Sequence, residues 1–267
     1  MAYIIDTETT GLRPPIEVTE LAYQHISWDC IVNGLTAIEE GTTVNDLLTV
    51  VFAESQKDSF LGRFKPSKAI EAKAAELTGI TNELVKNCPP SGAVKLPAIN
   101  YFIAHNAVFD WRVLGKPEVK RVCTKEIAQN IFADCKKDGL ANNKLSTLIG
   151  FFYPKEAEQL LKDSHGALQD IKLVYLLLLQ IKKKLPKADS FAYLLRYCSQ
   201  AEKTYEGLDK AKAIPKTRFK EVNGTYCIMF GKHSGTPIKE VPKDYMRWVY
   251  DNATNSEEER ELIRKFW

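Results

Sequence analysis

The sequence predicts an α/β protein with a partly parallel central sheet, followed by a small C-terminal module. Twice, a short apolar stretch typical of a strand leads straight into a stretch with helical spacing: residues 100–104 before 107–114, and 120–124 before 125–132. Such alternation of strands and helices is typical of sheets with parallel neighbouring strands. At 267 residues, the chain is long enough to bury one sizeable core and a second, smaller one.

The first strand begins almost at the start of the sequence. Residues 3–5 are apolar and run directly into Asp6, and the Thr-Thr-Gly turn at 9–11 follows. A Pro-Pro pair then breaks the chain, and residues 18–27 predict a second strand, antiparallel to the first.

Residues 28–62 are the least regular part of the sequence. The apolar, β-branched run at 46–53 predicts a strand, whereas Gly34 and Gly41 indicate loops. The next regular element is a helix over 67–79, with a serine as its N-cap and a glycine at its end.

The longest expected helix covers residues 166–184. Its apolar residues recur at helical spacing, and Pro186 ends it. The lysines at 182–184 suit the negative end of the helix dipole. A shorter helix is expected at 144–149.

Composition divides the chain into an N-terminal domain, a basic linker with a short helix, and a small α+β module, at residues 1–184, 185–220 and 221–267. The module predicts a strand at 225–230 and two helices, one opened by Pro242 and one capped by Ser256. Fewer than about 50 residues give a marginal core, so we expect the module to be stabilised by contact with the first domain, with a partner or with nucleic acid.

Nothing in the sequence suggests export or a membrane partner. The first strand starts at once, so we expect no signal peptide, and the longest apolar run, at 173–179, is far too short to span a bilayer. The six cysteines are scattered without a Cys-x-x-Cys pair, which is typical of reduced thiols and unlike a zinc cage or a disulfide scaffold. We therefore expect a cytoplasmic protein.

Basic charge is concentrated in one segment. Residues 182–220 carry 11 Lys/Arg against 4 Asp/Glu, whereas residues 1–181 carry 19 against 22. An electronegative domain with a basic tail suits a metal-dependent enzyme that acts on a polyanion, because the tail attracts phosphates that the domain repels. The alternative is a solvated tether whose lysines only keep it soluble.

Two carboxylates stand one residue apart at the end of the first strand. Side chains alternate along a strand, so Asp6 and Glu8 point the same way. Like charges this close repel, and a divalent cation such as Mg²⁺ or Mn²⁺ is the simplest partner that balances them. The alternative is a strand that ends in a solvated acidic turn.

Two further acids are candidates for the same site. Asp110 follows the His105-Asn106 turn, on a helix that comes after a strand, and Asp170 lies on the first turns of the longest helix, with His165 just ahead of it. Asp170 and His165 also have simpler explanations, since Asp170 suits a helix N-terminus and His165 could be a capping residue.

The order of these motifs resembles the DEDDh branch of the proofreading-type 3′-5′ exonuclease superfamily. The motifs are Asp6-x-Glu8-Thr9-Thr10-Gly11, His105-Asn106-x-x-Phe109-Asp110 and His165-x-Ala167-x-x-Asp170. Further stretches are similar to the exodeoxyribonuclease X group: Arg63-Phe64-x-Pro66, residues 77–81, residues 122–124, and, in the C-terminal module, Phe230-Gly231-Lys232-x-x-Gly235-Thr236 with Val241-Pro242-x-Asp244-Tyr245-x-x-Trp248. Residues 28–62 and the linker stay unmatched.

The resemblance implies a ribonuclease H-like exonuclease fold, with a mixed sheet flanked by helices, and two Mg²⁺ ions for which Mn²⁺ can substitute. Asp6, Glu8 and Asp170 would hold one ion, and Asp6 would bridge to the second. Asp110 would act on the second ion directly or through water. His165 would be the general base, and the two ions would assist an in-line displacement at phosphorus.

The resemblance also implies contacts with substrate. The backbone around Thr9, with His105 and Asn106, would bind the terminal nucleotide. Leu12 and Phe109 would wedge between bases or stack on them, and the alternative is that each belongs to the core.

The activity implied is metal-dependent hydrolysis of DNA from 3′ ends, of single strands or duplexes, with release of nucleoside 5′-monophosphates. Two alternatives stay open. One is an exoribonuclease that trims RNA 3′ ends, and the other is a nucleic-acid-binding or polymerase-associated module without turnover. The sequence indicates no particular protein partner.

Overall fold

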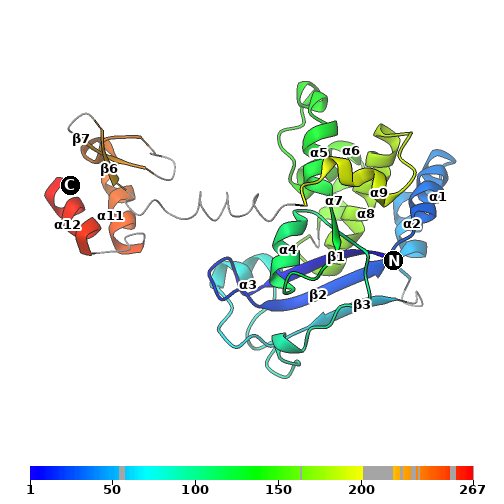
Figure 1. Cartoon of the computed structure of the whole chain (residues 1–267), viewed down its shortest axis with the longest axis horizontal. Coiled ribbons are helices and arrows are strands. Elements are labelled where there is room, and N and C mark those ends of the chain that lie inside the picture. Colours follow the sequence, from blue (N-terminus) through cyan, green and yellow to red (C-terminus); the bar gives the residue numbers. More distant parts are fainter. Residues whose placement is uncertain are drawn as a thin grey trace. The chain divides into compact units, whose positions relative to one another are not determined.

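A computed structural model describes residues 1–53, 58–162, 164–200, 219–222, 225–229, 233, 235–252 and 257–266. The chain divides into two compact units, residues 1–200 and 201–267. Figure 1 shows that the first unit combines a central sheet with covering helices, which confirms the predicted α/β class.

A five-stranded mixed sheet forms the middle of the first unit, in the order β3-β2-β1-β4-β5. The strands are β1 Ala2–Thr9, β2 Val18–His25, β3 Ser59–Arg63, β4 Tyr101–Ala104 and β5 Lys120–Cys123. β1, β2 and β3 are antiparallel neighbours, coloured blue to cyan in Figure 1, whereas β1, β4 and β5 run parallel. The central strand β1 is therefore the one that carries the two acids.

Alternation along β1 sends its side chains into two cores. Ala2 and Ile4 belong to the larger core, which α8 helps to form, whereas Tyr3 and Ile5 belong to a smaller core on the other face. The acid at position 6 continues the face of Ala2 and Ile4, toward α8.

Helices surround this sheet. Those of the first unit are α1 Trp28–Glu39, α2 Val44–Val51, α3 Ala72–Thr78, α4 Ala107–Val113, α5 Thr124–Ile131, α6 Leu145–Phe152, α7 Ala157–Leu161, α8 Ala167–Lys184 and α9 Phe191–Leu194, with 3₁₀ helices η1 Ser91–Ala93, η2 Asp134–Asp138 and η3 Leu195–Tyr197. The 18-residue α8 packs against β1, β2, α1, α5 and α6. It is the longest helix described, as predicted, and it joins the sheet to its covering layer.

The predictions for residues 28–62 were wrong in two places. The expected strand at 46–53 is helical, because Thr43 caps the N-terminus of α2 by accepting a hydrogen bond from the Asp46 N–H at 3.1 Å, and α2 buries an apolar face. Gly34 lies within α1 rather than in a loop, where it packs closely on Tyr175 of α8. Strand β3 also falls in this region.

The helix expected over 67–79 begins later. The N-cap of α3 is Glu71, and Ser67 instead donates from its N–H and its hydroxyl to the carboxylate of Glu17, at 2.8 and 2.7 Å. The expected end is confirmed, since Gly79 is left-handed, with φ of 70°.

Residues 185–200 belong to the first unit rather than to a linker. Ala188, Phe191 and Leu194 are buried in the larger core, so apolar burial fixes this segment to the domain. The rest of the predicted basic linker, residues 201–218, lies outside the described residues.

The second unit has its own small core. Its elements are β6 Phe219–Val222, β7 Thr225–Ile228, η5 Ile238–Glu240, α11 Lys243–Asn252 and α12 Glu257–Phe266. Met246, Val249 and Ile263 bring both helices into one cluster with the hairpin. The expected α+β composition is therefore present, while the predicted Ser256 cap and the Phe230-Gly231-Lys232 part of the motif lie outside the described residues.

Among the described residues of both units, no helix is long and apolar enough to cross a bilayer.

Candidate metal centre

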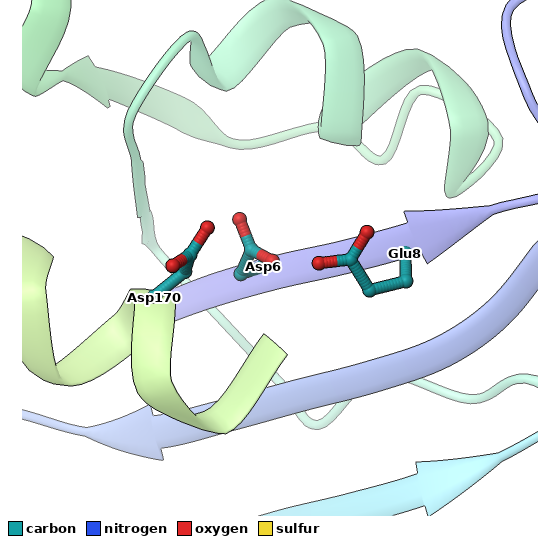
Figure 2. Close-up of side chains that lie close together, drawn as sticks. All are labelled: Asp6, Glu8 and Asp170. Atoms are coloured by element: carbon teal, nitrogen blue, oxygen red, sulfur yellow. The ribbon is translucent and has the colours of Figure 1, made fainter. Parts of the chain in front are cut away.

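Three of the four predicted acids meet at the C-terminal half of β1. Asp6, Glu8 and Asp170 each offer a carboxylate oxygen, and these oxygens all lie within 4.8 Å of one another. Figure 2 shows Asp6 and Glu8 projecting to the same side of β1, where Asp170 meets them from the first turn of α8. A residue near the N-terminus and one late in the domain thus share one site.

The local fold explains why the acids stand there. β4 pairs with β1 only at Ala2 to Ile4, so the second half of β1 runs beyond its parallel neighbour. The pairing with β2 continues to the end of the strand, with a register shift between Glu8 and Thr9. Such bulges are common beside active sites, because they redirect side chains at a strand end.

The carboxylates are strongly destabilised as anions. Burial, and then the charges of Asp110 and Asp170, raise the pKa of Asp6 well above its usual value. Burial, and then Asp170 and Glu20, raise the pKa of Glu8 to about 8. Within the described part of the chain, Asp6 Oδ2 is buried without a hydrogen-bond partner. Three converging carboxylates with an unsatisfied buried oxygen fit a hard divalent cation.

The fourth acid, Asp110, lies beside this cluster but is not one of its three members. Its Oδ1 accepts hydrogen bonds from the Thr7 N–H at 3.1 Å and from the Thr7 hydroxyl at 2.7 Å. Burial raises its pKa to about 7, although the bonds from Thr7 oppose that shift. Asp110 therefore places a further carboxyl group beside the site while it binds the edge of β1 that β4 leaves unpaired.

His165 reaches the site through its backbone. Its N–H donates to Asp170 Oδ1 at 3.3 Å, its φ is 73°, and the residue is exposed just before α8 begins. Few residues other than glycine adopt this left-handed conformation, which here turns the chain sharply into the helix. The imidazole is therefore open to solvent near the three acids, but it is outside the cluster.

His105 is held by the fold. Its Nδ1 lies 3.0 Å from Thr124 Oγ1 and its Nε2 lies 2.9 Å from the Asn143 carbonyl oxygen. Burial, together with the charge of Lys125, lowers its pKa to about 4, so the ring is neutral near pH 7. Both ring nitrogens therefore have hydrogen-bond partners within the protein. Asn106, by contrast, is the left-handed N-cap of α4, with φ of 77°.

The remaining predicted contact residues follow β1 or lie on α4. Leu12 is 67% exposed, and Phe109 is partly buried on α4. The Thr9 hydroxyl donates to the Gly11 carbonyl oxygen at 3.1 Å, so its side chain serves the turn. Gly11 has φ of 132° and an added Cβ would overlap the carboxylate of Glu71, so this turn requires glycine.

One acid at the site was missed by the sequence reasoning. Glu20 lies on β2 directly opposite Glu8, and the residue is only 5% exposed. An acid inside the apolar run from Val18 to Ala22 was the available signal, because a charge rarely stands within a buried strand without a partner.

Comparisons with known proteins agree on one group. No protein-family model matches the chain. The PolC-type DNA polymerase III of Streptococcus pneumoniae strain D39 is 28% identical over 164 aligned residues, which cover 52% of this chain and 11% of that protein. The chain therefore spans about a tenth of the length of this relative. Exodeoxyribonuclease 10 of Escherichia coli K12 is 24% identical over 277 aligned positions, with 100% of this chain and 98% of that protein covered.

A solved structure shows the same fold. Exonuclease X, in complex with 5′ overhanging duplex DNA, superposes with a TM-score of 0.50 at 20% identity, covering 73% of this chain and 99% of that one. The first unit thus has the mixed α/β architecture of the ribonuclease H-like exonuclease fold. The chain is thus similar to exonucleases both in sequence and in fold.

Proposed function

We propose that the chain is a metal-dependent 3′-5′ exodeoxyribonuclease that releases nucleoside 5′-monophosphates from DNA. The observation that carries this proposal is the convergence of Asp6, Glu8 and Asp170, with an unsatisfied Asp6 oxygen among them. The full-length likeness to exodeoxyribonuclease 10 supports DNA as the substrate.

In this proposal, Asp6, Glu8 and Asp170 would hold one divalent ion, and Asp6 and Asp110 would help to hold a second. Mg²⁺ is the expected ion, and Mn²⁺ can replace it. Bound ions would supply positive charge that favours attack by water and departure of the 3′ oxygen. Without them, the carboxylates would repel a DNA phosphate, so substrate binding and metal binding are coupled.

The chain's own side chains perform the remaining steps. An imidazole nitrogen of His165 takes the proton from the attacking water, since the residue is exposed beside Asp170. The exposed Leu12 and the partly buried Phe109 contact the terminal base, and backbone near Thr9 with Asn106 positions its sugar and phosphate. His105 holds the turn before α4 in place through its hydrogen bonds with Thr124 and Asn143.

A single assay tests the activity. Oligonucleotides of one sequence, as DNA and as RNA, are labelled at the 3′ or the 5′ end and incubated with Mg²⁺, Mn²⁺ or EDTA. We expect the 3′-labelled DNA to release labelled mononucleotide at once, and the 5′-labelled DNA to shorten stepwise, with no product in EDTA.

The same assay decides between the alternatives. Faster digestion of the RNA strand would replace the proposal with an exoribonuclease activity. DNA that is bound but never shortened with either metal would indicate a nucleic-acid-binding module. Fragments cut internally would exclude an exonuclease.

A further inference from the structure

The side chain of Glu20 joins three elements of the domain at the metal centre. Its Oε1 accepts a hydrogen bond from the Ala167 N–H at 3.1 Å, at the first turn of α8. Its Oε2 lies 2.8 Å from Arg63 Nε on β3. Both carboxylate oxygens are therefore engaged by donors, which leaves Glu20 poorly suited to be a metal ligand itself.

The sheet register brings these partners into one row. Arg63 on β3 pairs with Glu20 on β2, and Glu20 pairs with Glu8 on β1. Directly opposed residues lie on the same face of a sheet, so a cation, an anion and a proposed metal ligand follow one another across three strands. Without Arg63, Glu20 and Glu8 would be an uncompensated pair of like charges.

Helix α8 lacks a cap of its own at this end. Its N-cap is Gly166, which has no side chain to accept the free N–H groups of the first turn. Glu20 supplies an acceptor from a strand 147 positions away, and its negative charge suits the positive end of the helix dipole. Asp170 lies on the same turn, so whatever fixes Ala167 also fixes Asp170.

We propose that Glu20, oriented by Arg63, is a positioning residue that sets the separation between Asp170 on α8 and the acids of β1, and thereby the affinity of the metal centre. This inference rests on the proposed function, because it concerns the same metal centre. It goes further by adding two residues, on β2 and β3, to the machinery that shapes that centre. Changes in residues that orient metal ligands typically weaken metal binding by about 10- to 100-fold.

Two substitutions separate position from charge. Glu20→Ala removes the acceptor for Ala167 together with the charge, whereas Glu20→Gln removes the charge but keeps an oxygen that can accept the Ala167 N–H. If Glu20 acts by holding the Ala167 N–H in place, Glu20→Gln should keep most of the metal affinity that is lost in Glu20→Ala. If it acts only as one more negative charge, the two variants bind metal equally weakly.

Asp134→Asn is the matched control. Asp134 pairs with Lys184 at the other end of α8, at 2.6 Å and on the surface, so this variant also removes one charge and one tether of the same helix. We expect it to bind metal like the wild-type protein.

The full-length proteins are titrated with MnCl₂ by calorimetry, well below the unfolding temperature of each variant, and exchange of the Ala167 amide is followed in parallel. We expect Glu20→Ala to bind Mn²⁺ about 10- to 100-fold more weakly and to exchange that amide faster, with Glu20→Gln near wild type in both. Three results would each overturn the inference. Glu20→Ala could bind Mn²⁺ as tightly as the wild type, both Glu20 variants could lose the same affinity, or Asp134→Asn could lose as much affinity as Glu20→Ala. A wild-type protein that binds no Mn²⁺ would instead contradict the proposed function.

Discussion

Asp6 combines two opposing properties in one side chain. It is a proposed metal ligand, and it is a partly buried acid whose pKa is raised by burial and by neighbouring carboxylates. A group that function requires can therefore weaken the metal-free fold, because each ionised neighbour repels it.

Asp6→Asn should lower kcat by about 10²- to 10³-fold with Mg²⁺, because it removes a charge that the reaction uses directly. We expect Asp110→Asn to cost less, since its amide oxygen can still accept the hydrogen bonds from Thr7. Single-turnover rates on 3′-labelled DNA measure both. Glu76→Gln, on an exposed part of α3, is the control and should digest DNA at the wild-type rate. An Asp6→Asn protein as active as wild type would contradict the proposed site.

The raised pKa of Glu8 predicts that the stability of the metal-free protein, measured in EDTA, depends on pH. Its pKa rises from 4.5 to about 8 on folding, so between these values the folded protein retains a proton that the unfolded chain has released. The free energy of unfolding therefore falls as pH rises through this window, by at most about 1.4 kcal/mol per pH unit for this group.

Glu8→Gln has no such proton to release. Its free energy of unfolding, relative to the wild type, should therefore increase from pH 5 to pH 8. Urea titrations at several pH values, with EDTA present, measure the difference. A difference that stays constant with pH would show that Glu8 ionises normally in the folded protein.

At the scale of the element, α8 determines much of the architecture, because it contacts two strands and three helices. Its packing against α1 depends on one glycine. An added Cβ at Gly34 would overlap the hydroxyl of Tyr175, which donates to the Cys30 carbonyl oxygen at 3.2 Å.

Gly34→Ala should therefore destabilise the domain by about 1–3 kcal/mol, despite the higher helix propensity of alanine. Gly150→Ala is the matched control, because Gly150 is also helical and an added Cβ there meets nothing within 4 Å. That variant should gain about 0.4–1 kcal/mol. Urea unfolding measures both, and a stabilised Gly34→Ala protein would contradict the close approach of α1 and α8.

These elements also show how far the sequence alone could lead. β4, β5 and α8 were predicted because apolar spacing and flanking glycine or proline residues define them locally. The helix α2 was missed because its β-branched content favours a strand, while its Thr43-x-x-Asp46 cap was overlooked. Gly34 by itself indicates a loop, because the group that requires a glycine there, the hydroxyl of Tyr175, is far away in the sequence.

The site divides in the same way. Alternation along one strand placed Asp6 and Glu8 on one face, and the motif resemblance added Asp170. The roles of Glu20 and Thr7 could not be inferred, since they depend on the register of β2 and on the approach of α8 and α4. Local patterns do not determine such long-range interactions.

At the scale of the whole molecule, the basic excess is shared between the units. Residues 182–220 carry 11 Lys/Arg and 4 Asp/Glu. Of these, 5 Lys/Arg and 1 Asp/Glu fall in residues 182–200, which pack into the first unit. The second unit, from residue 201 on, carries 13 Lys/Arg against 11 Asp/Glu, a net charge of only +2. Residues 1–200 carry 24 against 23, a net charge of +1, so net charge alone assigns the attraction for DNA to neither unit.

Truncation after Gln200 leaves the first unit intact, whereas a cut at Lys182 would remove core residues. We expect this truncation to raise KM and to leave kcat nearly unchanged. The slope of log KM against log salt should flatten by roughly 0.7 for each DNA phosphate that the second unit neutralises in the full-length protein. Steady-state assays between about 50 and about 200 mM salt test this. A KM unchanged at low salt would exclude a role of the second unit in binding.

The alternation of side chains along β1 matters when the protein is refolded. A slip of one residue against β2 would turn Asp6 and Glu8 toward the Tyr3 core and present Ile5 and Thr7 to α8. Helix and strand content would hardly change, so circular dichroism would not detect the error, whereas nucleotide release would stop. Specific activity after refolding therefore measures the fraction of molecules with the correct strand alignment.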